Sequence, residues 1–288
     1  MSDANLQPPR VWFSSSSGLG KAMAEVALMQ GDSVVATLRR PELLAELSQI
    51  YHPSKLFIIE LDVTDKRAVE AAFARAREQF GHIDVVYNNA GAGYFGEVES
   101  MDEESARTLF EVNFWGATYV SKEAIRFFRE VNRPMGGHLL QASSLAAAQA
   151  VPGLSYYSAA KAALESLTEA IAFEIHPSWN IKVSCIQFGP FNTTIAGSHF
   201  KRAPIYTPYR DETLGANKAF ALFSNDATFT GHPTKAAQMM YMLSLLDNPP
   251  LRLPLHSMAV DWMRNTLEAT GKDLETYKSW SDDLYCDE

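Results

Sequence analysis

Short segments that are apolar on both faces constrain the fold of this chain more than any other feature. The strand-like segments are VWF (11–13), SVVATL (33–38), KLFIIEL (55–61), IDVVYN (83–88), GHLLQAS (137–143) and IKVSCIQ (181–187). Such segments, when helices separate them, are typical of a parallel sheet that is covered on both faces. With right-handed crossovers they predict a doubly wound α/β fold, in which ligands bind at the carboxyl ends of the strands.

The stretches between these segments have helical periodicity. Helices are predicted at 18–30, 41–50, 69–80, 101–131 and 155–176, the second opened by Pro41 and the third ended by Gly81. The predicted fold class is therefore a single-domain Rossmann-type doubly wound parallel sheet with helices on both faces.

The last third of the chain has a different pattern. Residues 191–233 carry scattered Pro, Gly, Thr and aromatic residues without a clear period, which favours a substrate-side loop or lid. Residues 234–288 are predicted to hold the C-terminal helices, near 234–246 and 258–270, with a short apolar run at 250–256. Because no Gly/Ser-rich or Pro-rich linker divides the sequence, residues 1–288 are interpreted as one domain.

Charge and cysteine content exclude several classes of function. The formal net charge of −9 argues against a nucleic-acid or anionic-membrane partner, since both require a basic surface. Cys185 and Cys286 lie far apart, and the seven histidines show no metal-ligand spacing, so no metal site is expected. The first ten residues lack the features of a signal peptide, and no apolar run reaches the length of a membrane span. We expect a cytoplasmic protein.

The stretch FSSSSGLG (13–20) lies where a strand gives way to a helix, and such a turn presents unpaired N–H groups to an anion. Gly18 and Gly20 would allow close approach of a pyrophosphate, whereas Ser14 stands where an earlier glycine would make the turn. The residues predicted to bind the cofactor here are Ser14, Ser16, Ser17, Gly18, Leu19 and Gly20. The alternative is a serine-rich turn that only caps the helix.

The second predicted strand ends in the sequence ATLRRPE, which bears on the choice of cofactor. Leu38 stands where an acidic residue would bind the ribose hydroxyls of NAD, and Arg39 and Arg40 follow it. A guanidinium group pairs with a 2′-phosphate in a bidentate manner, so NADPH is favoured, with Arg39 the better candidate and NAD the alternative. The alternative is that the two arginines are solvated side chains before a helix, with no role in binding.

Further motifs follow in order along the chain: SGLG (17–20), LDVTD (61–65), NNAG (88–91), VNFWG (112–116), SS (143–144) and YSAAK (157–161). Together they resemble the short-chain dehydrogenase/reductase family, over roughly residues 10–195. A lone Tyr-x-x-x-Lys would be weak evidence, but this ordered set is specific.

The resemblance implies catalytic roles for four residues. Tyr157 matches the family's catalytic acid/base, and Lys161 matches its partner. Ser144 lies 13 residues before Tyr157, as the family's substrate-orienting serine does, and Ser143 is the less favoured neighbour. Asn113 matches the asparagine that holds a proton-relay water.

The resemblance also implies contacts with the cofactor. Asp62 and Val63 fall where the adenine is contacted, and Thr193 falls on the threonine near the carboxamide. The remaining matches are Asn89, Ala90 and Gly91, which line the cofactor, and Gly189, Pro190 and Phe191 in the nicotinamide-side loop FGPFNT (188–193). Phe188 stands where the family usually has proline.

The chemistry of the Tyr157–Lys161 pair is understandable without the resemblance. Residues four apart on a helix share one face, and a nearby ammonium group lowers the pKa of a phenol. Tyr157 can then exchange a proton with the oxygen of a carbonyl or alcohol while Ser144 holds that oxygen. A packed tyrosine at a helix start is the structural alternative, and Tyr156 fits it better because no lysine follows it at that spacing.

These observations predict an NADPH-dependent carbonyl reductase or alcohol dehydrogenase. The last third of the chain contains several aromatic residues, which predict an apolar or aromatic small-molecule substrate. The alternative is that they pack a lid. These residues are Phe191, His199, Phe200, Tyr206, Tyr209, Phe220 and Phe223. The alternatives are an epimerase or dehydratase that retains its cofactor, and a dinucleotide-binding regulator or scaffold impaired by Ser14. By resemblance a homodimer or homotetramer is expected; the identity of the substrate and the direction of the reaction are left open.

Overall fold

The computed structural model describes residues 9–15, 18–193 and 201–286. Its centre is one seven-stranded sheet, in which every neighbouring pair is parallel and the order is β3-β2-β1-β4-β6-β7-β9. The strands are β1 (Val11–Ser15), β2 (Ser33–Leu38), β3 (Leu56–Glu60), β4 (Val85–Asn88), β6 (Gly137–Ser144), β7 (Ile181–Phe188) and β9 (Arg252–Leu255). The predicted doubly wound parallel sheet is confirmed.

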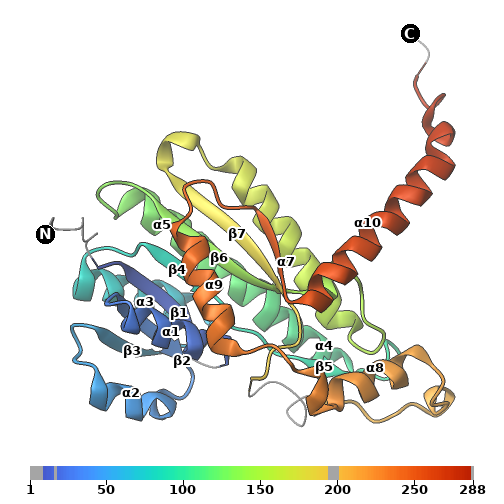
Figure 1. Cartoon of the computed structure of the whole chain (residues 1–288), viewed down its shortest axis with the longest axis horizontal. Helices are drawn as coiled ribbons and strands as arrows, with labels where there is room; N and C mark the ends of the chain where they lie inside the picture. The colour runs from blue at the N-terminus through green and yellow to red at the C-terminus, as the bar shows by residue number, and fades with distance from the viewer. Residues whose placement is uncertain (1–8, 16–17, 194–200, 287–288) are drawn as a thin grey trace, which may run out of the picture.

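Helices cover both faces of this sheet (Figure 1). One face packs against α1 (Leu19–Met29) and α9 (Pro233–Leu245), and the other packs against α3 (Lys66–Phe80), α5 (Ala117–Glu130) and α7 (Ser155–Glu174). Successive residues of a strand point to opposite faces, so Trp12 joins the first core and Phe13 the second. This two-sided burial explains why the strands are apolar throughout.

The direction of winding reverses between β1 and β4. From β1 the chain builds outward through β2 and β3, and from β4 it builds the other way through β6, β7 and β9. The carboxyl ends of β1 and β4 therefore border a crevice between diverging connections, which is where open α/β sheets bind ligands.

Three predicted helical regions differ in detail. The region 101–131 is α4 (Glu103–Phe110), a π-helical segment η2 (Glu111–Gly116) and α5. The region 41–50 begins with the 3-10 helix η1 (Pro41–Leu44) and continues as α2 (Ala45–Ile50). α10 (Ser257–Tyr277) runs seven residues past the predicted end and extends away from the body of the molecule (Figure 1).

The segment predicted as a loop or lid contains regular structure in its described part. α8 (Gly215–Ser224) lies within it, and β8 (Lys201–Arg202) pairs in parallel with β5 (Tyr94–Phe95). The remaining short elements are α6 (Leu145–Ala148), η3 (Pro177–Trp179), η5 (Thr207–Tyr209), η6 (Asp226–Thr228) and η7 (Lys278–Ser281). In the part of the chain that the structure describes, no helix has the length and apolarity of a membrane span.

Candidate active site

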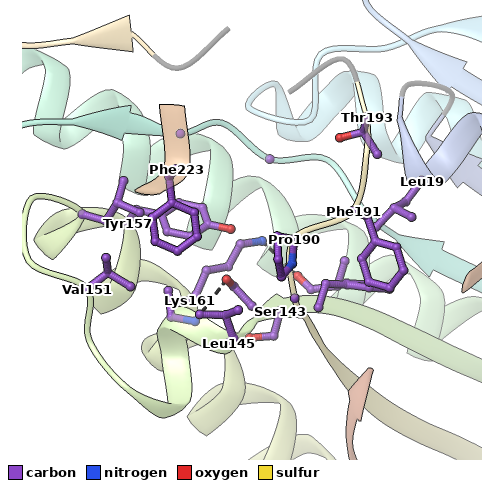
Figure 2. A pocket seen from close by; sticks show the side chains of 18 of the residues that line it. Leu19, Ser143, Leu145, Val151, Tyr157, Lys161, Pro190, Phe191, Thr193 and Phe223 are labelled. Carbon is purple, nitrogen blue, oxygen red and sulfur yellow. Dashed lines mark hydrogen bonds between the residues drawn. The ribbon is translucent and has the colours of Figure 1, made fainter. Parts of the chain in front are cut away.

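A pocket lies at the carboxyl ends of the central strands. Its walls include Asn89 and Gly91 after β4, Ser144 at the end of β6, and Gly189 and Pro190 after β7. Tyr157 and Lys161 enter it from the first turns of α7 (Figure 2). The structure therefore gathers motifs that are up to a hundred residues apart in sequence, as expected for the crevice of a parallel sheet.

Lys161 is held at the floor of this pocket. Its ammonium group donates a hydrogen bond to the carbonyl of Ala142, at 2.9 Å, and only 4% of the residue is exposed. The Nζ atom lies 6.0 Å from the centre of the Tyr157 ring. Burial lowers the pKa of Lys161 to about 8, and electrostatic interactions with Cys185 and Glu165 act in the opposite direction. At neutral pH the side chain is mainly cationic.

Ser144 is the serine that reaches Tyr157. Burial raises the pKa of Tyr157, and a hydrogen bond with Ser144 acts in the opposite direction. The Ser144 hydroxyl also accepts a hydrogen bond from the N–H of Ala146, at 3.1 Å, and so caps α6. The neighbouring Ser143 instead donates to the carboxylate of Glu165. The two adjacent serines thus face different partners.

Asn113 lies in the π-helical segment and is fully buried. Its side-chain amide pairs with the backbone of Ala92 in both directions, at 3.1 and 2.8 Å. A Cβ atom added to Gly91 would lie 3.0 Å from Asn113 Oδ1 and 3.6 Å from Lys161 Nζ. The structure therefore brings Asn113, Gly91 and Lys161 together, and it uses the Asn113 side chain to fix the loop after β4. Single π-helical turns in α-helices often occur at functional sites.

Ser14 occupies β1 with an ordinary backbone conformation. It pairs with Ala36 of β2 and Tyr87 of β4, and it is fully buried. Among the described residues, only Asn180 and His256 have positive φ without being glycine. The Ser14 hydroxyl donates a hydrogen bond to the carbonyl of Gly20, at 3.5 Å. Ser16 and Ser17, two of the predicted cofactor residues, lie outside the described residues.

The start of α1 has the geometry of an anion site. Gly18 precedes the helix with φ +52°, and a Cβ atom added there would lie 3.3 Å from Cβ of Thr193. The first turn of α1 contains no acidic residue, and in its described part no side chain caps it. Leu19 and Thr193 also line the pocket. A dinucleotide pyrophosphate fits these residues, since it requires exposed N–H groups and close backbone approach.

The residues assigned to the adenosine end surround the carboxyl ends of β2 and β3. Arg39 and Arg40 are exposed directly after β2. Burial opposes ionisation of Asp62, but hydrogen bonds from Thr64 and the charge of Arg39 outweigh it and lower the pKa of this carboxyl group. The side chain of Val63 packs against the π-helical segment at Gly116. Ala90 is half-buried in the loop after β4.

The other side of the pocket is apolar. Figure 2 shows Val151 and Phe223 beside Tyr157, whereas Leu19, Phe191 and Thr193 lie on the opposite side of Lys161. The wall beside Tyr157 also contains Leu145, Leu154 and Phe229. Of the lining residues in the described part of the chain, Lys161 alone carries a charge. A substrate group beside Tyr157 therefore meets hydrocarbon and aromatic surface.

Only some of the aromatic residues predicted to form the pocket line it. Phe191 and Phe223 line it, whereas Phe220 packs against Phe95 and under the guanidinium group of Arg202. Tyr206 is exposed, and Tyr209 donates to Glu99 at 3.0 Å. His199 and Phe200 lie outside the described residues. The prediction missed Phe229 and the short helix α6, because neither belongs to a periodic pattern.

Sequence comparison identifies related proteins over nearly the whole chain. The short chain dehydrogenase family matches residues 13–203. An uncharacterized oxidoreductase of Schizosaccharomyces pombe is 38% identical over 262 residues, which are 91% of this chain and 86% of that protein. A 3-ketodihydrosphingosine reductase of Bacteroides thetaiotaomicron is 29% identical over 83% of this chain and 84% of that protein.

A solved structure shares the same fold. It is the crystal structure of a short-chain dehydrogenase from Streptomyces avermitilis, with a TM-score of 0.87 and 31% sequence identity. The match covers 97% of this chain and 100% of that chain. The similarity thus extends beyond the motif-bearing residues to the C-terminal part of the molecule.

Proposed function

Because the chain belongs to the short-chain dehydrogenase/reductase family of oxidoreductases, we propose that it is an NADPH-dependent carbonyl reductase or alcohol dehydrogenase. Its proposed substrate is a small apolar ketone, aldehyde or secondary alcohol. The observation that carries the proposal is the convergence of Ser144, Tyr157 and Lys161 in one pocket whose opposite wall is apolar. The catalytic roles of these residues are part of the proposal.

Each of the three residues has a task that its surroundings support. Hydride donation or acceptance is the chemistry that NADPH or NADP supplies when bound. Tyr157 donates a proton to the substrate oxygen during reduction and removes one during oxidation. Ser144, which hydrogen-bonds with Tyr157, holds the same oxygen. Lys161 stabilises the phenolate form of Tyr157 by its charge, and its pKa of about 8 leaves that charge present at neutral pH.

The preference for NADPH rests on the end of β2. Leu38 is buried there and offers no carboxylate, while Arg39 is exposed and close enough to Asp62 to lower the pKa of that carboxyl group. An exposed guanidinium group at this position can form two hydrogen bonds with a 2′-phosphate. NAD is the alternative cofactor.

The apolar wall supports an uncharged substrate. Phe223 and Phe229 come from the segment after the sheet, and Leu145 and Val151 come from the connection before α7. A carboxylate or phosphate placed among these side chains would lose its hydration without gaining a partner. The Bacteroides relative is named a 3-ketodihydrosphingosine reductase, and reduction of a ketone agrees with the proposed type of reaction.

A homodimer or homotetramer remains a proposal from the family resemblance, and a cytoplasmic location remains a proposal from the sequence features described above. The contacts would involve the helices after β4 and β6, and Trp115 and Phe173 expose 45% and 78% of their surface on these elements. A non-catalytic regulator was the alternative because of Ser14. The ordinary backbone and enclosed side chain of Ser14 give no support to the idea that this residue impairs the turn between β1 and α1.

The first test is a fluorescence titration of the purified protein with NADPH and NADH. We expect tighter binding of NADPH, and in Arg39→Ala a loss of roughly 10- to 100-fold in NADPH affinity with little change for NADH. A screen of apolar ketones follows, with Tyr157→Phe as the catalytic control. That variant should bind NADPH normally but turn over at least about 100-fold more slowly.

Equal affinities for both cofactors would refute the role of Arg39 and leave the reductase intact. If neither cofactor binds at millimolar concentration to a folded sample, the oxidoreductase proposal itself is wrong.

A further inference from the structure

Glu165 is a buried carboxyl group that the proposed reaction does not use. It lies on α7 one turn after Lys161 and two turns after Tyr157, so the three side chains share one face of the helix. Only 8% of the residue is exposed. A glutamate is enclosed to this extent only where partners compensate for lost hydration.

The partners of Glu165 come from three strands. Ser143 of β6 donates to Oε1 at 2.5 Å, and Nε2 of Gln187 on β7 lies 3.1 and 3.0 Å from the two carboxylate oxygens. Nε of Arg252 on β9 lies 3.7 Å from Oε2. Each partner is a donor or a cation, so these contacts stabilise the ionised carboxylate against the effect of burial, which raises the pKa of Glu165.

This carboxylate is the negative group beside Lys161. In the described structure the titratable and charged groups around Lys161 are Tyr157 and Glu165 on its own helix and Cys185 on β7, with Arg252 of β9 behind Glu165. Burial raises the pKa of Cys185 to about 12, so its thiol is neutral at physiological pH. Burial also raises the pKa of Glu165, but hydrogen bonds from Ser143 and Gln187 and the charges of Arg252 and Lys161 oppose this.

We propose that Glu165 is a positioning residue, which fixes the end of β6 through Ser143 and supplies the negative charge that keeps Lys161 cationic. Ser143 directly precedes Ser144, the substrate-orienting serine. The Glu165 carboxylate is therefore linked both to the residue next to Ser144 and to Lys161, the partner of the catalytic tyrosine. The inference rests on the proposed function, because it assigns Glu165 to the same catalytic group.

The test measures the charge state of Lys161 without requiring turnover. Protein labelled with ¹³C-lysine is titrated by NMR, and the Lys161 signal is assigned by its loss in Lys161→Arg. In Glu165→Gln we expect the Lys161 midpoint to fall by about one pH unit, since removal of a nearby negative charge weakens proton binding. Glu165→Asp, which keeps the charge, should restore most of that shift.

Glu169→Gln is the matched control. Glu169 also accepts from Arg252, at 3.2 and 2.8 Å, but it lies one turn further from Lys161 and its side chain is 38% exposed. Its substitution also removes one negative charge that pairs with Arg252. We expect the Lys161 midpoint to stay at the wild-type value. An equal shift in both glutamine variants would overturn the specific role of Glu165.

A second measurement covers the case in which Glu165→Gln fails to fold. Titration of ¹³C-glutamate-labelled wild-type protein reports Glu165 itself, whose carboxyl group must be ionised at pH 7. A neutral Glu165 at that pH, or an unchanged Lys161 midpoint in a folded Glu165→Gln variant, would refute the proposal. Where a ketone substrate is found, the alkaline limb of kcat should move to lower pH by the same amount. If no substrate is found, the NMR titrations still decide the role of Glu165.

Discussion

At the scale of single residues, Ser14 shows how a serine can be accommodated where the family resemblance leads us to expect a glycine. Its hydroxyl bonds to Gly20 and its backbone continues β1, so the residue connects the first strand to the first helix. The side chain is enclosed between these elements and does not line the pocket. The sharp change of direction falls later, at Gly18, where φ is +52°.

Ser14→Gly should therefore weaken the fold more than the cofactor site. Glycine gains conformational freedom in the unfolded chain, so we expect a loss of roughly 0.5–1 kcal/mol in the free energy of unfolding. The NADPH dissociation constant should remain within about threefold of wild type. Urea denaturation and fluorescence titration measure the two effects, and Ser14→Ala separates the loss of the hydroxyl from the change in the backbone. A large gain in NADPH affinity would show that the serine restricts binding.

At the scale of elements, the packing of α5 on β6 depends on the absence of a side chain at Gly137. A Cβ atom added there would overlap the ring of Phe128, which is fully buried on α5. Strand and helix can approach this closely only because residue 137 is glycine, and the contact supports the strand that ends at Ser144.

We expect Gly137→Ala to lower the free energy of unfolding by about 1–3 kcal/mol, because an extra methyl group in a packed core forces neighbours apart. Gly271→Ala is the control: it lies in α10 with no neighbouring atom within 4 Å of the added Cβ, so no loss is expected. Urea denaturation of both variants gives the comparison. Equal stabilities would mean that α5 shifts freely on the sheet.

The sequence predicted elements best where burial imposed a pattern. β2 was predicted at its observed bounds, because a strand buried on both faces is apolar throughout. α8 was missed, since its ten residues contain Gly, Asn and Ser and follow a stretch of irregular composition. The π-helical segment around Asn113 was predicted as continuous helix, because composition does not distinguish a single π-helical turn from the α-helices on either side of it.

The candidate site was predictable where short motifs determine it. Tyr157 and Lys161 share a helix face by their spacing alone, and Ser144 was assigned from its match to the family's motifs. The Glu165 cluster was not predicted, because its members come from α7, β6, β7 and β9 and no motif connects them. Glu165 follows Lys161 at the same four-residue spacing that singled out Lys161, which was the one available signal.

At the scale of the whole molecule, the C-terminal segment has two parts: a base, residues 257–270 of α10, and an arm, residues 271–286, which holds the rest of α10 and η7. Its base packs near the pocket, where Trp262 contacts Phe223 and Thr266 donates to the carbonyl of Ala148 at 3.2 Å. Beyond it, Leu274 and Trp280 expose 64% and 75% of their surface. The arm therefore contributes little to the packing of this chain.

Removal of residues 271–288 should leave the free energy of unfolding of the isolated chain within about 0.5 kcal/mol of the full-length value. The exposed apolar side chains of the arm do not gain burial on folding, so their loss costs little. Urea denaturation at several protein concentrations is the appropriate measurement. A loss that grows with protein concentration would show that the arm packs against a second molecule.

The strand order also determines when the pocket can exist during folding. β7 pairs with β9, so Cys185 meets Arg252 across 67 residues of chain, and Arg252 then reaches Glu165 and Glu169 of α7. Parallel pairings between distant segments form late, because the entropy of closing long loops must be lost first. A refolding chain should thus regain its helical circular dichroism before its catalytic activity, and a nascent chain carries Tyr157 and Lys161 long before it completes their surroundings.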